Sequence, residues 1–225
     1  MQMTKELEER LKLMQRFNQV LGNKRYIKKK IYNDRIFVHN DIMYATDGFI
    51  FVAAANLTDC KDFSFFKCGN KKFEYMDSGI QEVKEDKEAL GDGKTLEKIL
   101  QPLDCASVSF DIDFCGGYTL PVRLCSSWSK RYKDIMTVNF QTEEAIIDFC
   151  GGVEADGGIT GTYGDIIKNI SGTIPENPIH LSFWHIMEIM KQCKVKKIRI
   201  ESNTDRRINT CKVGDYTFVF MSCDK

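Results

Sequence analysis

The sequence predicts an α+β protein in which antiparallel strands pack with a small number of amphipathic helices. Three observations predict this class. An amphipathic helix opens the chain, a strand–turn–strand pattern follows it, and a second amphipathic helix lies between strand patterns near the C-terminus. The chain has 225 residues, of which 43% are hydrophobic. It is therefore long enough for one large domain or for two domains of about 110 residues each.

The first predicted helix extends from Thr4 to Leu21. Its apolar residues recur at spacings of three and four, so they share one face that is expected to pack against the core. These residues are Leu7, Leu11, Met14, Phe17 and Leu21. Thr4 suits the N-cap position, and Gly22 followed by Asn23 is typical of a helix C-terminus.

Strands follow this helix, and the clearest are the two halves of a hairpin from Ile42 to Ala55. Two apolar runs flank Thr46-Asp47-Gly48, and Asp-Gly is a strong hairpin signal because glycine takes a positive φ at no steric cost. Further strand patterns lie before and after the hairpin, at Ile31–Val38, Phe63–Phe66 and Lys72–Tyr75.

The second half of the chain repeats this style. Its first strand candidates are Val108–Phe114, Tyr118–Leu124, Thr137–Phe140 and Ala145–Phe149. Pro178 then precedes a predicted helix from about Leu181 to Cys193. The chain closes with the strand patterns Lys197–Glu201, Arg206–Lys212 and Tyr216–Met221.

The nine cysteines favour neither a zinc site nor a disulfide framework. Their number is odd and no two of them form a C-x-x-C pair, whereas structural zinc needs closely spaced ligands. We interpret them as small buried hydrophobic residues in a reducing cytoplasm. The charged N-terminus does not resemble a signal peptide, and no apolar run reaches the roughly 18 residues that a membrane span requires.

No catalytic motif is present in the sequence. It lacks a P-loop, a G-x-S-x-G elbow and an H-E-x-x-H pair, and His180 and His185 are five residues apart, which does not suit a helical metal pair. We therefore expect a non-catalytic protein without a metal or other cofactor. A cysteine nucleophile paired with His39 or His185 stays open as an alternative.

Charge is balanced overall, because Lys plus Arg and Asp plus Glu each number 32. A neutral chain binds nucleic acid only if its basic residues gather on one face. Two basic clusters come directly after the two predicted helices: Lys24, Arg25 and Lys28–Lys30, and Lys191, Lys194, Lys196, Lys197 and Arg199. They are either solvated helix ends that complement the helix dipole or a surface that follows a phosphate backbone.

Several short motifs occur in a consistent order at the two ends of the chain. The N-terminal ones are Leu11-x5-Phe17-x3-Leu21, Lys24-Arg25-Tyr26 and Tyr44-Ala45-Thr46-Asp47-Gly48-Phe49. The C-terminal ones are Glu176-Asn177-Pro178-x-x-Leu181, Lys197-Ile198-Arg199-Ile200 and Tyr216-Thr217-Phe218-Val219-Phe220-Met221. Together they resemble the first and last repeats of the bacterial DNA polymerase III β sliding clamps. The chain departs from that family at its end, where Ser222-Cys223-Asp224-Lys225 replaces the usual Pro-Met-Arg-Leu.

The resemblance implies βαβββ repeats whose antiparallel sheets carry helices on one face. The usual clamp chain has three domains, and this chain has room for two, which we expect at residues 1–103 and 104–225. In that family, basic residues on and beside the helices contact duplex DNA. Lys24 and Arg25 match the basic link of that family, and the DNA contacts that we predict are Lys12, Arg16, Lys24, Arg25, Lys28, Lys191 and Lys194.

The resemblance also implies a function without catalysis. The chain would be a DNA replication processivity factor that encircles double-stranded DNA without sequence specificity, as a homo-oligomer that is a trimer if the ring closes. Val219 and Met221 match the groove that binds short peptides from polymerases, although both residues equally suit an ordinary core. Two alternatives stay open: a small cysteine-dependent enzyme, and a clamp-fold protein-binding module that no longer forms a ring.

Overall fold

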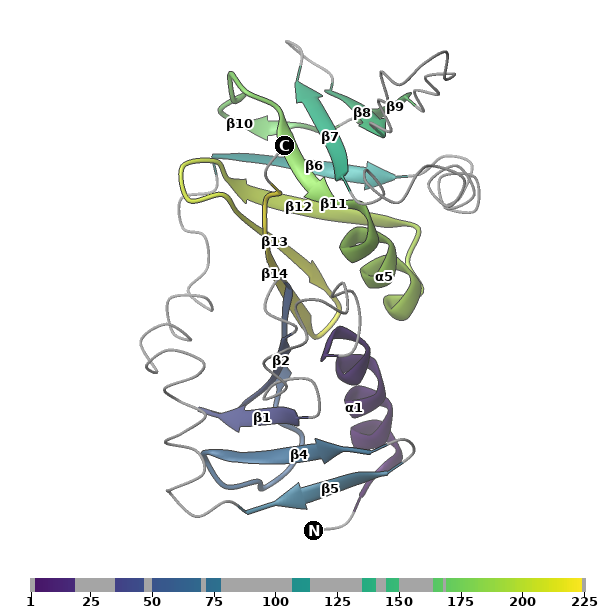
Figure 1. Cartoon of the computed structure of the whole chain (residues 1–225), viewed down its shortest axis with the longest axis vertical. Coiled ribbons are helices and arrows are strands. Elements are labelled where there is room, and N and C mark those ends of the chain that lie inside the picture. The colour runs from purple at the N-terminus through teal and green to yellow at the C-terminus, as the bar shows by residue number, and fades with distance from the viewer. Residues whose placement is uncertain are drawn as a thin grey trace, which may run out of the picture. The chain divides into compact units, whose positions relative to one another are not determined.

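The computed structural model describes residues 3–18, 35–46, 50–69, 72–77, 107–113, 135–140, 145–149, 164–167 and 169–223. The chain divides into two compact units (Figure 1). Unit 1 comprises Met1–Pro102 together with Gly214–Phe220, and unit 2 comprises Leu103–Val213 together with Met221–Lys225. The chain therefore returns to unit 1 for one strand after it has formed most of unit 2. The predicted domain boundary at residue 103 stays a prediction.

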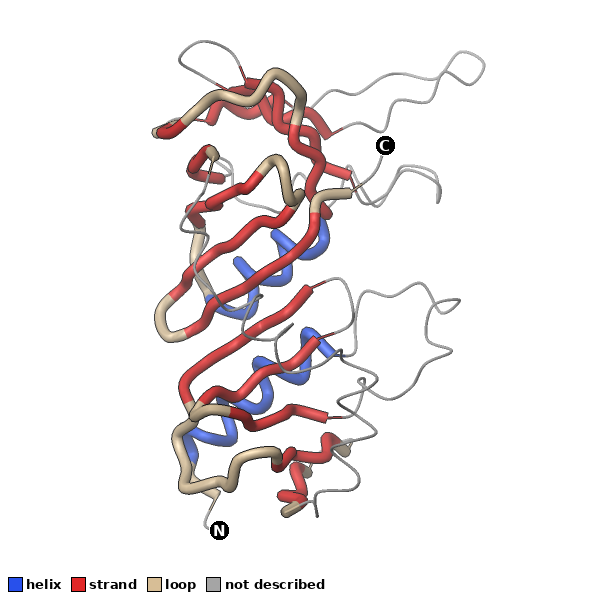
Figure 2. Tube along the Cα trace, turned by 90° about the vertical axis from the view of Figure 1, so that its left-hand side faces the viewer, coloured by secondary structure: helices blue, strands red, loops and turns tan. Residues whose placement is uncertain are grey.

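Unit 1 is one helix packed on a set of antiparallel strands. Helix α1 (Lys5–Asn18) contacts β1, β2 and β3, and Figure 2 shows it along one face of the strands. The strand order is β14-β3-β2-β1-β4-β5. The bounds are β1 Arg35–His39, β2 Ile42–Thr46, β3 Ile50–Ala55, β4 Ser64–Cys68, β5 Phe73–Met76 and β14 Tyr216–Met221.

The apolar face predicted for the first helix is confirmed within the described residues. Leu7, Leu11, Met14 and Phe17 are fully buried, and the ring of Phe17 packs on that of Phe218 at 5.1 Å. Thr4 caps the helix, because its Oγ1 accepts the N–H of Leu7 at 3.2 Å. Residues 19–34 lie outside the described part of the chain, so the predicted end of this helix at Leu21 does too.

The strand pairing of the predicted hairpin is also confirmed. Strands β2 and β3 are antiparallel, with Ile42 opposite Ala55 and Thr46 opposite Phe51. The turn residues 47–49 lie outside the described part. A second tight turn joins β1 to β2 through Asn40 and Asp41, whose φ angles of 49° and 58° suit these two residue types.

Unit 2 contains one helix and two groups of antiparallel strands. The first group follows the order β10-β6-β12-β13 and the second follows β11-β7-β8-β9. In the first group the bounds are β6 Val108–Asp113, β10 Ser171–Gly172, β12 Lys197–Asn203 and β13 Ile208–Val213. In the second they are β7 Ile135–Phe140, β8 Ala145–Phe149, β9 Gly164–Ile167 and β11 Ile179–Ser182. The antiparallel α+β class is confirmed.

Helix α5 (Phe183–Cys193) begins later than predicted, because the preceding residues form β11, which pairs with β7. Ser182 is the N-cap, and its Oγ accepts the N–H of His185 at 3.4 Å. At the other end, Lys194 adopts a left-handed conformation with φ 56° and closes the helix through its backbone N–H. The strands β9, β10 and β11 were not predicted.

Candidate nucleic-acid interface

Helix α1 presents a charged but balanced face to solvent. Its exposed cations are Lys5, Lys12 and Arg16, and its exposed or half-buried anions are Glu6, Glu8 and Glu9. The Lys12 Nζ lies 2.5 Å from Glu8 Oε1, one turn earlier on the helix. Two of the residues predicted to contact DNA, Lys12 and Arg16, are therefore exposed, but acidic residues of the same helix offset their charge.

The C-terminal end of α5 has a different charge balance. Lys191, Lys194 and Lys196 are exposed, and none of them forms an ion pair within the described part of the chain. The acidic residue one turn earlier, Glu188, accepts a hydrogen bond from the Gln192 amide at 2.6 Å. Because cations are favoured at a helix C-terminus, these lysines are stable there while their ammonium groups stay in water. We call Lys191, Lys194 and Lys196 the α5 lysine cluster.

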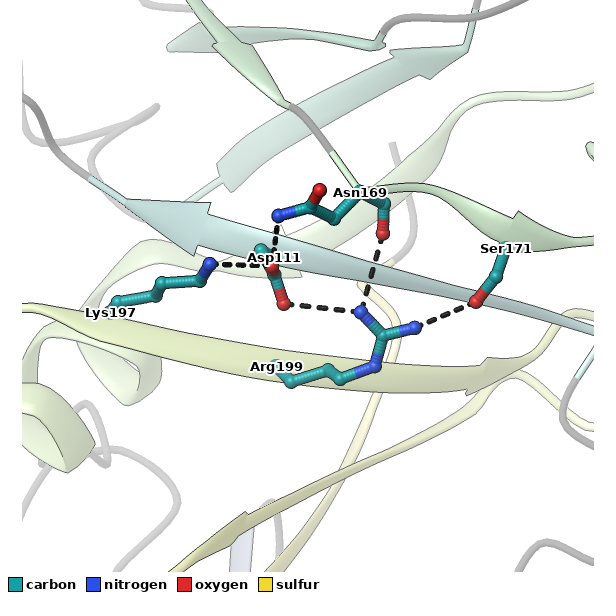
Figure 3. Close-up of polar contacts among 5 residues, drawn as sticks. All are labelled: Asp111, Asn169, Ser171, Lys197 and Arg199. Atoms are coloured by element: carbon teal, nitrogen blue, oxygen red, sulfur yellow. Dashed lines mark hydrogen bonds and ion pairs between the residues drawn. The ribbon is translucent and has the colours of Figure 1, made fainter.

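The next two cations along the chain, Lys197 and Arg199 of β12, are held by unit 2 itself (Figure 3). Arg199 lies opposite Asp111 of β6 in the strand register, with Nη1 3.2 Å from Oδ1. The Lys197 Nζ lies 2.7 Å from Oδ2, and the Asn169 amide donates to the same oxygen at 2.8 Å. Arg199 also donates to Ser171 Oγ at 2.7 Å.

The carboxylate of Asp111 is stabilised in its charged form. Burial alone would raise its pKa, but hydrogen bonds from Lys197, Asn169 and Arg199, together with the charge of Lys197, outweigh burial and lower the pKa. One carboxylate therefore neutralises part of the charge of two cations. This leaves the α5 lysine cluster as the less compensated part of the basic segment that the sequence singled out.

The remaining predicted DNA contacts, Lys24, Arg25 and Lys28, lie outside the described residues. Their role stays a prediction. The predicted groove residues lie on β14, where Val219 is buried at 7% exposure and faces Phe51 across the strand pair. Met221 is 59% exposed. Phe218 and Phe220 are both buried, so Met221 is the residue of this apolar strand segment that is most open to a ligand.

Three of the described thiols, those of Cys60, Cys193 and Cys211, do not have the environment of an activated nucleophile. Burial raises the pKa of Cys60, that of Cys193 to about 11 and that of Cys211 to about 12, whereas a reactive thiol has a lowered pKa. Among the described residues, no group of three or more His, Cys, Asp or Glu side chains could hold a metal ion. The described helices include none that is long and apolar enough to cross a membrane.

No protein-family model and no curated protein sequence matches the chain. Solved structures do match it. The DNA polymerase III β subunit of Borrelia burgdorferi aligns with a TM-score of 0.61 at 11% identity, over 97% of this chain and 62% of that chain. The β sliding clamp of Caulobacter crescentus aligns with a TM-score of 0.58 at 10% identity, over 98% and 64%. The chain has the sliding-clamp fold.

A third clamp, from Helicobacter pylori, was solved with a bound DNA ligase peptide. It aligns with a TM-score of 0.55 at 12% identity, over 98% of this chain and 64% of that one. This clamp-fold chain thus spans less than two thirds of the length of the clamps that it matches. The fold expected from the sequence motifs is confirmed.

Sequence reasoning missed two polar features of this clamp-fold chain. One is the cluster around Asp111, and the other is Arg10, which is buried on α1 and bonded to Asp215. Asp111 and Arg10 are both buried, whereas a charged side chain is usually exposed. The one available signal for Arg10 is its spacing of three residues from Leu7 and four from Met14, which places it on the apolar face.

Proposed function

We propose that this protein is a sliding-clamp-like processivity factor that encircles duplex DNA and does not catalyse a reaction. The observation that supports it best is the clamp fold, which covers 97–98% of the chain in the three alignments described above. A ring that encloses DNA holds it by topology, so the individual phosphate contacts can be weak and independent of sequence. Such a role requires no metal or cofactor.

The charge distribution suggests which helix supplies the stronger contacts. In α1 the exposed cations are matched by nearby glutamates, whereas the α5 lysine cluster has three lysines without an ion pair in the described structure. We therefore propose that Lys191 and Lys194 contribute more to DNA affinity than Lys12 and Arg16. We also propose that three basic residues of the segment after α1 contact DNA alongside Lys12 and Arg16. These residues are Lys24, Arg25 and Lys28.

The proposed assembly rests on the share of the clamp chains that this chain spans. The chain spans 62–64% of the matching clamp chains, which suits two clamp-like domains, residues 1–103 and 104–225. A closed ring of six domains would then need three copies. Head-to-tail association of identical chains closes into such a ring when the rotation between neighbours fits.

Partner binding is the last element of the proposal. The H. pylori clamp binds a DNA ligase peptide. We propose that this chain likewise docks short apolar peptides of replication proteins such as a polymerase, in the cytoplasm. We propose Met221, which is exposed, as the residue that contacts such a peptide, whereas Val219 is buried. A flexible and polarizable methionine suits apolar ligands of varied shape.

A retention experiment tests the function. The protein is incubated with closed circular plasmid or with the same plasmid made linear, and the bound fraction is measured after gel filtration as salt is raised. A clamp that encircles DNA stays on the circle and slides off the linear ends. The charge reversal Lys191→Glu with Lys194→Glu should weaken initial binding at every salt concentration and reduce the salt dependence.

The matched control is Lys67→Glu with Lys212→Glu, which changes the charge equally at two exposed strand positions that are not among the proposed DNA contacts. Equal retention on circular and linear plasmid would refute encirclement. Equal weakening by both double changes would refute the α5 site.

A second function has some support from the balanced charge of the chain and of α1. It is a clamp-fold module that binds a protein partner and forms no ring. Light scattering separates the two proposals. A mass of three chains supports the ring, while a monomer at tens of micromolar, without retention on circular DNA, supports the module.

A further inference from the structure

Arg10 is a buried cation on the apolar face of α1. Its residue is 4% exposed, and its neighbours one turn away on this face, Leu7 and Met14, are fully buried. A buried charge is unfavourable unless it is paired and hydrogen-bonded, so the partners of Arg10 show what keeps it there.

Those partners come from two strands that are distant in sequence. Nη1 donates to the backbone carbonyl of Ala55, the last residue of β3. Nη2 donates to Asp215 Oδ2 at 3.0 Å, in the turn before β14. The guanidinium also lies over the ring of Tyr216, the first residue of β14, at 5.6 Å. The planar fork of an arginine can make these contacts together, whereas a lysine ammonium is a point charge.

These contacts meet at one end of the β3–β14 pair. In the strand register Tyr216 lies opposite Ala54, and the pairing continues to Phe220 opposite Ile50. Arg10 therefore bridges the carbonyl at the end of one strand and the turn that begins the other. We call Arg10, Ala55, Asp215 and Tyr216 the Arg10 latch.

Strand β14 is also a separate piece of unit 1. The chain enters unit 1 at Gly214 and leaves it after Phe220, while the rest of the unit is formed by Met1–Pro102. Within unit 1, β14 lies at the end of the strand order and pairs there with β3. Packing of Phe218 on Phe17 adds one aromatic contact with α1. Among the described residues of unit 1, β14 therefore joins the other strands through a single strand pairing, and an element held by one pairing can open locally.

We propose that the Arg10 latch controls a local opening in which β14 leaves β3 as one segment, while the remainder of unit 1 stays folded. This inference is independent of DNA binding and of ring formation. Opening would expose the edge of β3 and free the strand that carries Val219 and Met221. The Arg10 latch thus joins a residue near the N-terminus to residues near the C-terminus and would set how often β14 separates from β3.

Hydrogen exchange of the full-length protein, read by mass spectrometry on peptic fragments, tests the proposal. The variants are Arg10→Met, which keeps an unbranched side chain without the charge, and Asp215→Asn. In Arg10→Met we expect amides of β14 and β3 to exchange at least about tenfold faster. We expect the same pattern, smaller in size, in Asp215→Asn. Exchange in β1, β4, β6 and β12 should not change.

Lys12→Met is the matched control, because it removes a cation from the exposed face of the same helix. Asp215→Asn keeps the test valid if Arg10→Met does not fold, since the Asp215 side chain is 74% exposed and lies outside the core. Unchanged exchange in β14 would overturn the proposal. So would faster exchange throughout unit 1, because Arg10 would then be an ordinary contributor to the core.

Discussion

Arg199 on β12 lies directly opposite Asp111 on β6, and its Nη1 is 3.2 Å from the aspartate Oδ1. Lys197 approaches the other carboxylate oxygen at 2.7 Å. On the same strand, Phe110 and Ile112 alternate with Asp111 and are fully buried in the core. The polar cluster thus occupies the face of β6 away from the apolar core, where it joins β6 and β12 through side chains as well as backbone bonds.

We expect Asp111→Asn to lower the free energy of unfolding by about 1–3 kcal/mol at neutral pH, because two cations lose their charged acceptor. The folded-state pKa of Asp111 is lowered, against the effect of burial, by hydrogen bonds from Lys197, Asn169 and Arg199. Its stabilising contribution is therefore complete above the ordinary aspartate pKa and disappears as the pH falls through the folded-state value. Urea unfolding at neutral and strongly acidic pH measures this difference.

The control for this prediction is Asp113→Asn, at an exposed position two residues along the same strand. We expect a change of less than about 0.5 kcal/mol there. An equal loss in both variants, or an Asp111→Asn loss that persists in strong acid, would contradict the role assigned to the cluster.

Substitution of Lys194 by glycine should have opposite effects on the stability of the protein and on its proposed binding to DNA. Its φ of 56° is strained for a side chain with a Cβ and easy for glycine. We expect Lys194→Gly to raise the free energy of unfolding by about 1 kcal/mol while it weakens binding to duplex DNA. Lys194→Gln should weaken DNA binding equally without this gain. Thermal unfolding and DNA titration of both variants measure the two effects, and tighter binding by either variant would contradict the prediction.

The two predicted groove residues should respond differently to substitution. Val219 is buried, so Val219→Ser should cost roughly 2–3 kcal/mol of unfolding free energy. Met221 is 59% exposed, so Met221→Ser should change stability by less than about 0.5 kcal/mol. Met221→Ser should nevertheless weaken the binding of an apolar polymerase-type peptide. Calorimetry with such a peptide checks this, and undisturbed binding would remove Met221 from the site.

The half-buried thiol of Cys193 should be slow to react. Burial raises the pKa of Cys193 to about 11, so only about one thousandth of it is thiolate at pH 8. We expect iodoacetamide to modify Cys193 slowly in the folded protein and rapidly in urea, with the folded-state rate rising with pH. Mass spectrometry of tryptic peptides measures the rate at each cysteine. Fast modification of Cys193 at neutral pH would instead favour the cysteine-enzyme alternative.

The elements that the sequence predicted well are those determined by local patterns. Spacings of three and four located α1, and alternating apolar runs around a turn located β2 and β3. The start of α5 was misplaced because Leu181 continues the apolar pattern, although a strand pairing with β7 occupies it. That pairing joins segments that are far apart in sequence, so no local pattern reports it.

The polar clusters could not be predicted for the same reason. Asp111 meets Arg199 across 88 residues and Asn169 across 58, and Arg10 meets Asp215 across 205. Neither the amino-acid types nor their spacing in the sequence indicates which cation forms an ion pair with which carboxylate. Only the strand order brings them together. The same order places Lys197 and Arg199 against Asp111, which distinguishes them from Lys191 and Lys194.

The return of the chain to unit 1 has a consequence for folding during synthesis. Strand β14 leaves the ribosome only after the whole of Leu103–Val213 has been made. Until then β3 has no partner on the side that β14 will occupy, and the Arg10 side chain lacks the carboxylate of Asp215. An open strand edge is a place where nascent chains associate wrongly. Completion of unit 1 therefore requires that unit 2 be translated first. A ribosome that stalls before β14 would hold a nascent chain whose uncovered β3 edge can pair with strands of other chains.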